Sequence, residues 1–320
     1  MTPTSRRATS TTPTSTRATS TRSGADARLD VRRTVKLYIG GAFPRSESGR
    51  SYVVSDTRGR FLANAAQGSR KDARDAVVVA RGALAGWAGA TAYNRGQVLY
   101  RVAEVMEGRF DQFASEVAAA EGLTPARARA TVAAAIDRWV WYAGWSDKIA
   151  QVLGGLNPVA GPYFNISAPE PTGVVAVLAP QASSLLGLVS VLAPVIVSGN
   201  TAVVLASEER PVPAITLAES LATSDVPGGV VNIITARTAE VAPWLASHRD
   251  VNAIDLAGAA GADGVVWGDL EREAAGNLKR VLRPAGTGAS AVEPDWTVTP
   301  DLTRLRAHLE TKTVWHPKGR

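Results

Sequence analysis

Residues 171–207 carry no charged side chain, and this stretch constrains the fold more than any other part of the chain. An apolar stretch of that length could cross a membrane as a helix. Its interior, however, contains residues that break helices or form turns: Pro180, Gly187, Pro194 and the run Ser198-Gly199-Asn200. These breaks divide it into a strand (173–178), a helix (184–197) and a strand (202–206). Parallel strands covered on both faces read as continuous apolar runs, so the stretch predicts a buried βαβ unit and a soluble, cytoplasmic protein with no membrane partner.

The segments that follow continue the alternation of strand and helix. Helical and β-prone patterns alternate at 212–223 (helix), 228–236 (strand), 239–248 (helix), 251–261 (strand) and 268–282 (helix). Short connections between alternating strands and helices are typical of a doubly wound parallel sheet. We therefore predict an α/β protein with a Rossmann-like, doubly wound parallel sheet.

Helices and short β elements are expected around this sheet. Apolar spacing predicts amino-terminal helices at 69–89, 95–109, 110–122 and 124–152, and a short helix near 300–310. Turn-flanked β-prone runs predict hairpins at 35–54 and 161–173.

Four aromatic residues gather on the helix expected at 124–152: Trp139, Trp141, Tyr142 and Trp145. They admit two interpretations, a platform for an aromatic ligand or packing in the core or in a subunit interface. Their position on a long helix favours packing.

The net charge of +6 is concentrated at the amino terminus. Residues 1–34 hold seven arginines against two aspartates, are rich in Ser and Thr, and contain almost no large apolar residues. Such a segment cannot bury a core, so 1–34 is interpreted as a disordered tail. A targeting peptide and a nucleic-acid-binding arm are the alternatives, and we expect no nucleic-acid partner.

The chain contains no cysteine and three scattered histidines. Disulfides, thiolate metal sites and a cysteine nucleophile are thereby excluded within this sequence. We expect no metal site.

Several segments in order resemble the NAD(P)-dependent aldehyde dehydrogenase family, over about residues 35–286, its cofactor-binding half. The most specific are "PYFNISAPEPTGVVAVLAP" (162–180), "LAPVIVSGNTAVVL" (192–205) and "VPGGVVNIIT" (226–235). The ending "ETKTVWHPKGR" is similar to the family's last strand. The resemblance implies an NAD-binding domain at 35–286 with an oligomerisation hairpin at 161–173. A linker, a short helix and an oligomerisation strand then follow at 287–320.

The family's catalytic residues find no counterpart in this sequence. In the family, a cysteine attacks the aldehyde, an asparagine stabilises the oxyanion, and a glutamate activates water. The resemblance places Ala182 at the oxyanion asparagine, with Gln181 or Ser183 as displaced substitutes, and Pro284 at the general base. Glu310 follows Gly286 by 24 positions, where the family inserts its catalytic domain. No catalytic residue is therefore assigned.

The cofactor site that the resemblance implies is only partly retained. Leu205 stands where the family has the lysine that grips the adenosine ribose, and Glu208 stands where it has a glutamate. Gly258 lies in the turn that receives the pyrophosphate. Loss of one charge-assisted hydrogen bond costs about 1.5–3 kcal/mol, so NAD or NADP would bind weakly through Glu208 and Gly258, and no cofactor is required.

Two functions follow from the resemblance. The first is a non-catalytic pseudoenzyme subunit that associates with a full-length aldehyde dehydrogenase or forms a homo-oligomer, because the last strand of the family adds to a neighbouring subunit. In that interpretation Thr311–Trp315 is a strand without its usual partner. The second is an NAD(P)-binding oxidoreductase subunit that contributes to a composite active site on aldehydes.

Overall fold

The computed structural model describes residues 31–286 and 292–319. The chain divides into two compact units, Met1–Val31 and Arg32–Arg320, and only the second is discussed below. The tail predicted at 1–34 lies outside the described residues as far as residue 30. Regular structure begins slightly before the predicted boundary, because Thr34–Val35 forms strand β1.

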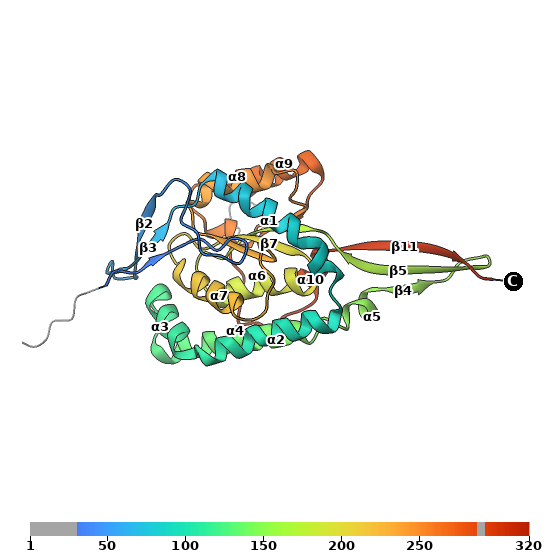
Figure 1. Cartoon of the computed structure of the whole chain (residues 1–320), viewed down its shortest axis with the longest axis horizontal. Helices are drawn as coiled ribbons and strands as arrows, with labels where there is room; N and C mark the ends of the chain where they lie inside the picture. The colour runs from blue at the N-terminus through green and yellow to red at the C-terminus, as the bar shows by residue number, and fades with distance from the viewer. Residues whose placement is uncertain (1–30, 287–291, 320) are drawn as a thin grey trace, which may run out of the picture. The chain divides into compact units, whose positions relative to one another are not determined.

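A five-stranded parallel sheet forms the centre of the unit Arg32–Arg320, which confirms the predicted fold class (Figure 1). Its strand order is β10-β9-β6-β7-β8. The strands are β6 (Val174–Leu178), β7 (Thr201–Leu205), β8 (Val231–Ile234), β9 (Ala253–Asp255) and β10 (Arg280–Leu282). The charge-free stretch thus forms β6, helix α6 (Leu186–Val197) and β7, and every residue of these three elements is buried.

The sheet separates two hydrophobic clusters, because successive strand side chains point to opposite faces. On β6, Val175 and Val177 belong to the cluster that includes α6 and α7 (Val212–Ala222). Val174, Ala176 and Leu178 belong to the other cluster. That second face is covered by α1 (Arg70–Gly89), α8 (Thr238–Ser247) and α9 (Trp267–Ala274). Burial on both faces explains why β6 shows no apolar–polar alternation.

The remaining amino-terminal helices pack outside α6 and α7 (Figure 1). They are α2 (Ala92–Gly108), α3 (Phe110–Glu121) and α4 (Pro125–Ala143), whereas the short α5 (Ile149–Leu153) contacts β5. Thr124 caps α4 and accepts a hydrogen bond from the backbone N–H of Arg127. Trp139 and Tyr142 are buried, and Trp141 and Trp145 pack against the same core, so the aromatic cluster serves packing. None of the helices in the described ranges is long and apolar enough to cross a membrane.

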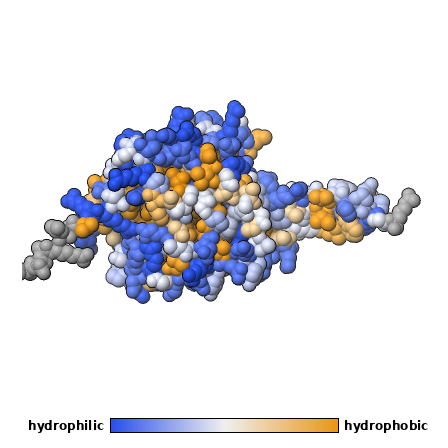
Figure 2. Space-filling view, viewed as in Figure 1, coloured by the Kyte–Doolittle hydropathy of each residue, from blue (hydrophilic) through white to orange (hydrophobic). Residues whose placement is uncertain are grey.

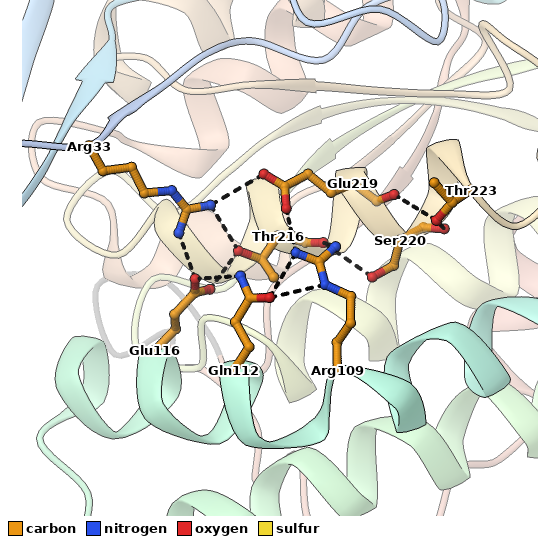
Figure 3. A network of polar contacts seen from close by, with 8 residues as sticks. All are labelled: Arg33, Arg109, Gln112, Glu116, Thr216, Glu219, Ser220 and Thr223. Atoms are coloured by element: carbon orange, nitrogen blue, oxygen red, sulfur yellow. Dashed lines mark hydrogen bonds and ion pairs between the residues drawn. The ribbon is translucent and has the colours of Figure 1, made fainter. Parts of the chain in front are cut away.

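A polar network fastens the start of the described chain to α3 and α7 (Figure 3). The Arg33 guanidinium donates to Glu116 on α3 at 2.6 Å and to Glu219 on α7 at 3.3 Å. Arg109 pairs with the same Glu219 carboxylate, and Thr216 donates to Glu116 at 2.6 Å. Because each carboxylate is shared, the network joins three chain segments rather than two.

The amino-terminal β structure differs from the hairpin predicted at 35–54. Strand β2 (Ser51–Ser55) forms its hairpin with β3 (Phe61–Ala66), and β1 lies parallel to β3. The first predicted β run instead places Tyr38 in a bridge with Ile233 of β8. Tertiary pairing with the central sheet therefore overrode the local turn signal.

A second correction concerns residues 268–282, which were predicted as one helix. Helix α9 ends at Ala274 and residues 280–282 form β10. Leu278 between them adopts φ 56°, in the left-handed region that ends helices. The short helix predicted near 300–310 is α10 (Thr303–Ala307).

A separate three-stranded antiparallel sheet extends as an arm from the amino-terminal start of β6 (Figure 1). Its order is β11-β5-β4, with β4 (Gly155–Asn157), β5 (Tyr163–Pro171) and β11 (Leu309–Pro317). The hairpin predicted at 161–173 is therefore wrong, because these residues form the single strand β5 and its hairpin partner is β4. The last strand is not unpaired within the chain, because β11 pairs with β5 from Leu309–Pro171 to Pro317–Tyr163, while its other side has no strand neighbour among the described residues.

Candidate functional site

The strand order of the parallel sheet reverses between β6 and β9, and we call the region outside the carboxyl ends of these two strands the crevice. From β6 the chain proceeds outward through β7 and β8 on one side, and then through β9 and β10 on the other. In open α/β sheets, ligands bind outside the carboxyl ends of the strands where the strand order reverses. The loops that follow β6 and β9 therefore border the candidate site, and both predicted cofactor residues lie at this edge of the sheet.

Glu208, predicted to bind cofactor, follows β7 and is engaged within the chain. One carboxylate oxygen accepts from the Arg237 guanidinium at 2.6 Å, and the other accepts from the backbone N–H of Thr238 at 2.8 Å. Thr238 is the first residue of α8, so the carboxylate also interacts favourably with the positive end of the helix dipole. Glu208 thus stabilises the start of α8, and sequence analysis did not anticipate its partner Arg237.

Gly258, the second predicted cofactor residue, lies where the loop after β9 meets the end of β6. It belongs to the short 3₁₀ helix η1 (Ala257–Gly261). A Cβ atom at this position would lie 2.0 Å from the carbonyl oxygen of Ala179. The neighbouring backbone donors are also used, because the Ala257 N–H donates to Asp255 and the Ala259 N–H donates to the Leu256 carbonyl, each at 2.9 Å. Gly258 is therefore required for close backbone contact.

The residues that the resemblance places at and beside the oxyanion position make contacts within the chain. Ala182 has no polar side chain, and the side chain of Gln181 connects β6 to β7. Its amide nitrogen donates to the Ala179 carbonyl at 2.8 Å, and its oxygen accepts from the Glu208 N–H at 2.9 Å. The Ser183 hydroxyl accepts from the Gly187 N–H at 2.9 Å. Both substitutes considered from the sequence have structural partners.

The chain after β10 returns across the same edge of the sheet. Pro284, at the general-base position, is buried, and Ala285 forms an antiparallel bridge with Val292. The next segment then crosses α4 and α6, where the buried Arg138 donates to the Trp296 and Val298 carbonyls at 2.9 Å each. This path brings the carboxylate of Glu293 into the crevice.

Glu293 connects the two loops that border the crevice. Its Oε1 atom accepts from the backbone N–H of Gln181 and, at 2.9 Å, from that of Ala182. The same oxygen lies 3.1 Å from where a Cβ of Gly261 in η1 would stand. No motif in the sequence pointed to Glu293, because it lies in an irregular segment and its partners are backbone groups.

A second carboxylate borders the same loop. Glu121, the last residue of α3, accepts from the Ser184 N–H and the Ser184 hydroxyl, each at 2.7 Å. Burial raises the pKa of the Glu121 carboxyl, and the nearby negative charge of Glu293 adds to the increase. The Arg210 guanidinium also borders this loop and opposes the increase, because its positive charge favours the ionised Glu121 carboxylate.

These contacts decide whether the residues present suit a dinucleotide. Glu208, which the resemblance assigns to the ribose, is paired with Arg237. The amides of the turn around Gly258 bond within the chain, and the Glu293 carboxylate occupies the crevice. In this arrangement the described residues do not fit NAD or NADP. No group of three or more His, Asp or Glu side chains suited to a metal occurs among the residues that the structure describes.

The arm carries the other functional candidate, an exposed apolar surface. Cross-strand register places Leu156 opposite Ile166 and Ile166 opposite Val314. Phe164 lies on the same face, two residues from Ile166. We call these four residues the arm row. Their exposed fractions are 65% for Leu156, 47% for Ile166, 48% for Val314 and 42% for Phe164. Figure 2 shows hydrophobic surface on the arm.

The base of the arm is fixed to the sheet by a buried asparagine. The Asn200 side chain accepts from the Gly173 N–H and donates to the His308 carbonyl, each at 2.7 Å. Gly173 lies between β5 and β6, directly before β6, and His308 lies directly before β11. Asn200 therefore holds both strands at the point where they leave the central sheet.

Comparison with known proteins gives one consistent result. Residues 43–292 match the aldehyde dehydrogenase family. The 2-hydroxymuconic semialdehyde dehydrogenase of Pseudomonas sp. strain CF600 is 31% identical over 236 residues, which are 71% of this chain and 48% of that protein.

Solved structures agree with the sequence comparison. HpcC from Thermus thermophilus superposes with a TM-score of 0.73 at 28% identity, over 78% of this chain and 47% of that chain. The NAD+ complex of an aldehyde dehydrogenase from Bacillus cereus gives a TM-score of 0.73 at 24% identity, over 78% and 50%, and supports the fold. The chain spans about half the length, or less, of the curated relatives it matches.

Proposed function

The chain belongs to the aldehyde dehydrogenase family, and on that premise we propose that it is a non-catalytic subunit that docks through its arm onto a full-length aldehyde dehydrogenase. The observation that carries the proposal is the arm row, an apolar face on a sheet that extends from the central unit. Exposed apolar surface gathered in this way is typical of protein–protein contacts. The proposal treats the arm as an assembly element.

The second support is the outer edge of β11. Strand β11 pairs with β5 on one side, and among the residues that the structure describes no strand pairs with its other side. Residues 310–317 are all exposed. A strand with one free edge can add to a sheet of another chain through backbone hydrogen bonds.

The choice of partner follows from the family resemblance. In the family, the last strand adds to the catalytic-domain sheet of a neighbouring subunit, so a full-length member would supply the matching edge. A second copy of this chain is the alternative occupant of the arm.

The assignment as a non-catalytic subunit rests on which side chains this sequence has at the family's catalytic positions. The 320-residue sequence contains no cysteine, so the family's thiolate attack on an aldehyde has no nucleophile within it. Gln181, one of the two substitutes, also uses its side-chain amide in bonds to Ala179 and Glu208.

Co-expression followed by size measurement tests the proposal. The chain, a full-length aldehyde dehydrogenase of the same organism, and the mixture are compared by size-exclusion chromatography with light scattering. A heteromeric complex is expected, and it should weaken strongly in Val314→Lys, which places a charge in the arm row.

Thr313→Lys is the matched control. Thr313 is a β-branched, exposed neighbour on the opposite face of β11, so this variant adds the same charge outside the arm row. Equal loss of assembly in both variants would argue against docking through the arm row. A stable monomer with every dehydrogenase tested would refute the proposal, and a homo-oligomer without heteromers would assign the arm to a second copy.

The alternative function is an NAD(P)-binding subunit of a composite active site. The family membership is its only support, because the described crevice residues do not fit a dinucleotide. Titration of the assembled complex with NAD and NADP distinguishes the two functions, since additional cofactor sites per complex would favour the alternative.

A further inference from the structure

The backbone of the loop after β6 forms a small anion site. The N–H groups of the consecutive residues Gln181 and Ala182 both point at one oxygen atom, Oε1 of Glu293. Successive amides that converge in this way are a recurrent cradle for carboxylate and phosphate oxygens. The site lies beside the switch point, where this class of sheet binds the phosphates of a nucleotide.

Apart from these two bonds, the Glu293 carboxylate has no hydrogen-bond partner among the described residues. Its second oxygen is buried. A buried oxygen without a partner costs free energy that the two amide bonds must offset. The nearby Glu121 carboxylate adds electrostatic repulsion. The carboxylate is thus held by the cradle and by the bridge between Ala285 and Val292 that precedes it.

We propose that Glu293 is an internal ligand of this cradle, that it lies between the loop after β6 and the η1 turn that the resemblance assigns to the cofactor pyrophosphate, and that it thereby excludes NAD(P) from the chain. A carboxylate oxygen and a phosphate oxygen require the same two N–H donors, so they cannot occupy the cradle together. Removal of the carboxylate leaves an empty cradle for a diphosphate. The Arg210 guanidinium, which donates to the Ala182 carbonyl, then provides a cation beside it.

The exclusion is local and does not depend on docking through the arm. Glu293 lies at the carboxyl edge of the central sheet, whereas the arm leaves the sheet from Gly173. Failure of one proposal therefore leaves the other unaffected.

Calorimetric titration of three proteins with inorganic pyrophosphate, ADP and NAD tests the inference. The wild type should bind none of them at millimolar concentration. Glu293→Ala should bind pyrophosphate and ADP about ten- to a hundredfold more tightly than the wild type, the range expected for one charge-assisted contact. Asp295→Ala is the matched control, because Asp295 is an exposed carboxylate two residues away that accepts only from Thr297. It should behave as the wild type.

A second readout does not depend on binding. In Glu293→Gln the side chain keeps its shape and an acceptor oxygen but loses its charge. The amides of residues 181 and 182 should then exchange hydrogen several-fold faster than in the wild type, because a charge-assisted hydrogen bond is about twice as strong as a neutral one. Equal pyrophosphate affinity in the wild type and Glu293→Ala, including no binding by either, would overturn the inference. Unchanged exchange in Glu293→Gln would overturn it as well, and it remains measurable if Glu293→Ala does not fold.

Discussion

Replacement of Gly258 by alanine should destabilise the protein because the loop after β9 contacts the end of β6 through backbone atoms alone. The added Cβ would lie 2.0 Å from the Ala179 oxygen, 2.5 Å from the Ala179 carbon and 2.7 Å from the Leu178 oxygen. Cβ atoms essentially never approach other atoms more closely than 3.0 Å. The nearest contact must therefore open by 1.0 Å, which is 3.0 minus 2.0, and no flexible side chain can absorb the shift.

The expected cost is at the upper end of the range for overpacking, about 3 kcal/mol. With a urea slope of about 3 kcal/mol per molar, the unfolding midpoint should fall by about 1 M. Gly82→Ala is the matched control, because Gly82 lies inside α1 and an added Cβ meets nothing within 4 Å. It should gain about 0.5–1 kcal/mol. An unfolding free energy of Gly258→Ala within 0.5 kcal/mol of the wild type, about the error of extrapolation, would refute the close-contact role of Gly258.

Three further predictions concern stability. Burial lowers the pKa of His308 to about 4, so its imidazole is neutral in the folded chain and is protonated below about pH 6.5 only on unfolding. Between pH 6.5 and 4 the unfolding free energy of the wild type should fall by about 1.4 kcal/mol per pH unit relative to that of His308→Leu. If urea unfolding gives the same difference between the two proteins at pH 7 and at pH 5, this prediction is contradicted. Arg33→Ala should lower the free energy of unfolding by about 1 kcal/mol, because Glu116 loses a partially buried partner. Arg101→Ala removes an exposed ion pair and should lower it by almost nothing. Equal losses in the two variants would contradict the role of the network. Trp139→Ala should cost about 3–5 kcal/mol by thermal or urea unfolding, since the side chain is fully buried, and a cost below 1 kcal/mol would place Trp139 outside the core.

The parallel sheet was predictable from the sequence because its signal is local. The breaks at Pro180 and Asn200 delimit elements that are buried whatever the rest of the chain does. The predicted limits of α6 and β7 differ from the observed limits by two residues or fewer. The hairpin at 35–54 failed because its first β run pairs with β8, a partner almost 200 residues away. Such pairing leaves no local pattern.

The candidate site was predictable only in position. The resemblance placed Glu208 and Gly258 at the carboxyl edge of the sheet, where the structure has them. The contacts around these residues could not be predicted from the sequence. Arg237, the partner of Glu208, belongs to the loop before another helix, and Glu293 accepts hydrogen bonds only from backbone amides. The arm row depends on the register between β4, β5 and β11. The pairing of β5 with β11 joins segments about 150 residues apart, and no local pattern predicts it.

Hydrogen exchange along β11 tests the proposed assembly most directly. In an antiparallel strand about half of the amides face each neighbour, so half of those in 309–317 have no strand partner within the described chain. When the chain binds a full-length aldehyde dehydrogenase by strand addition, these outer amides should become protected by tenfold or more, while β4 changes little. A stable complex in which exchange of 309–317 is unaltered would contradict docking through this strand.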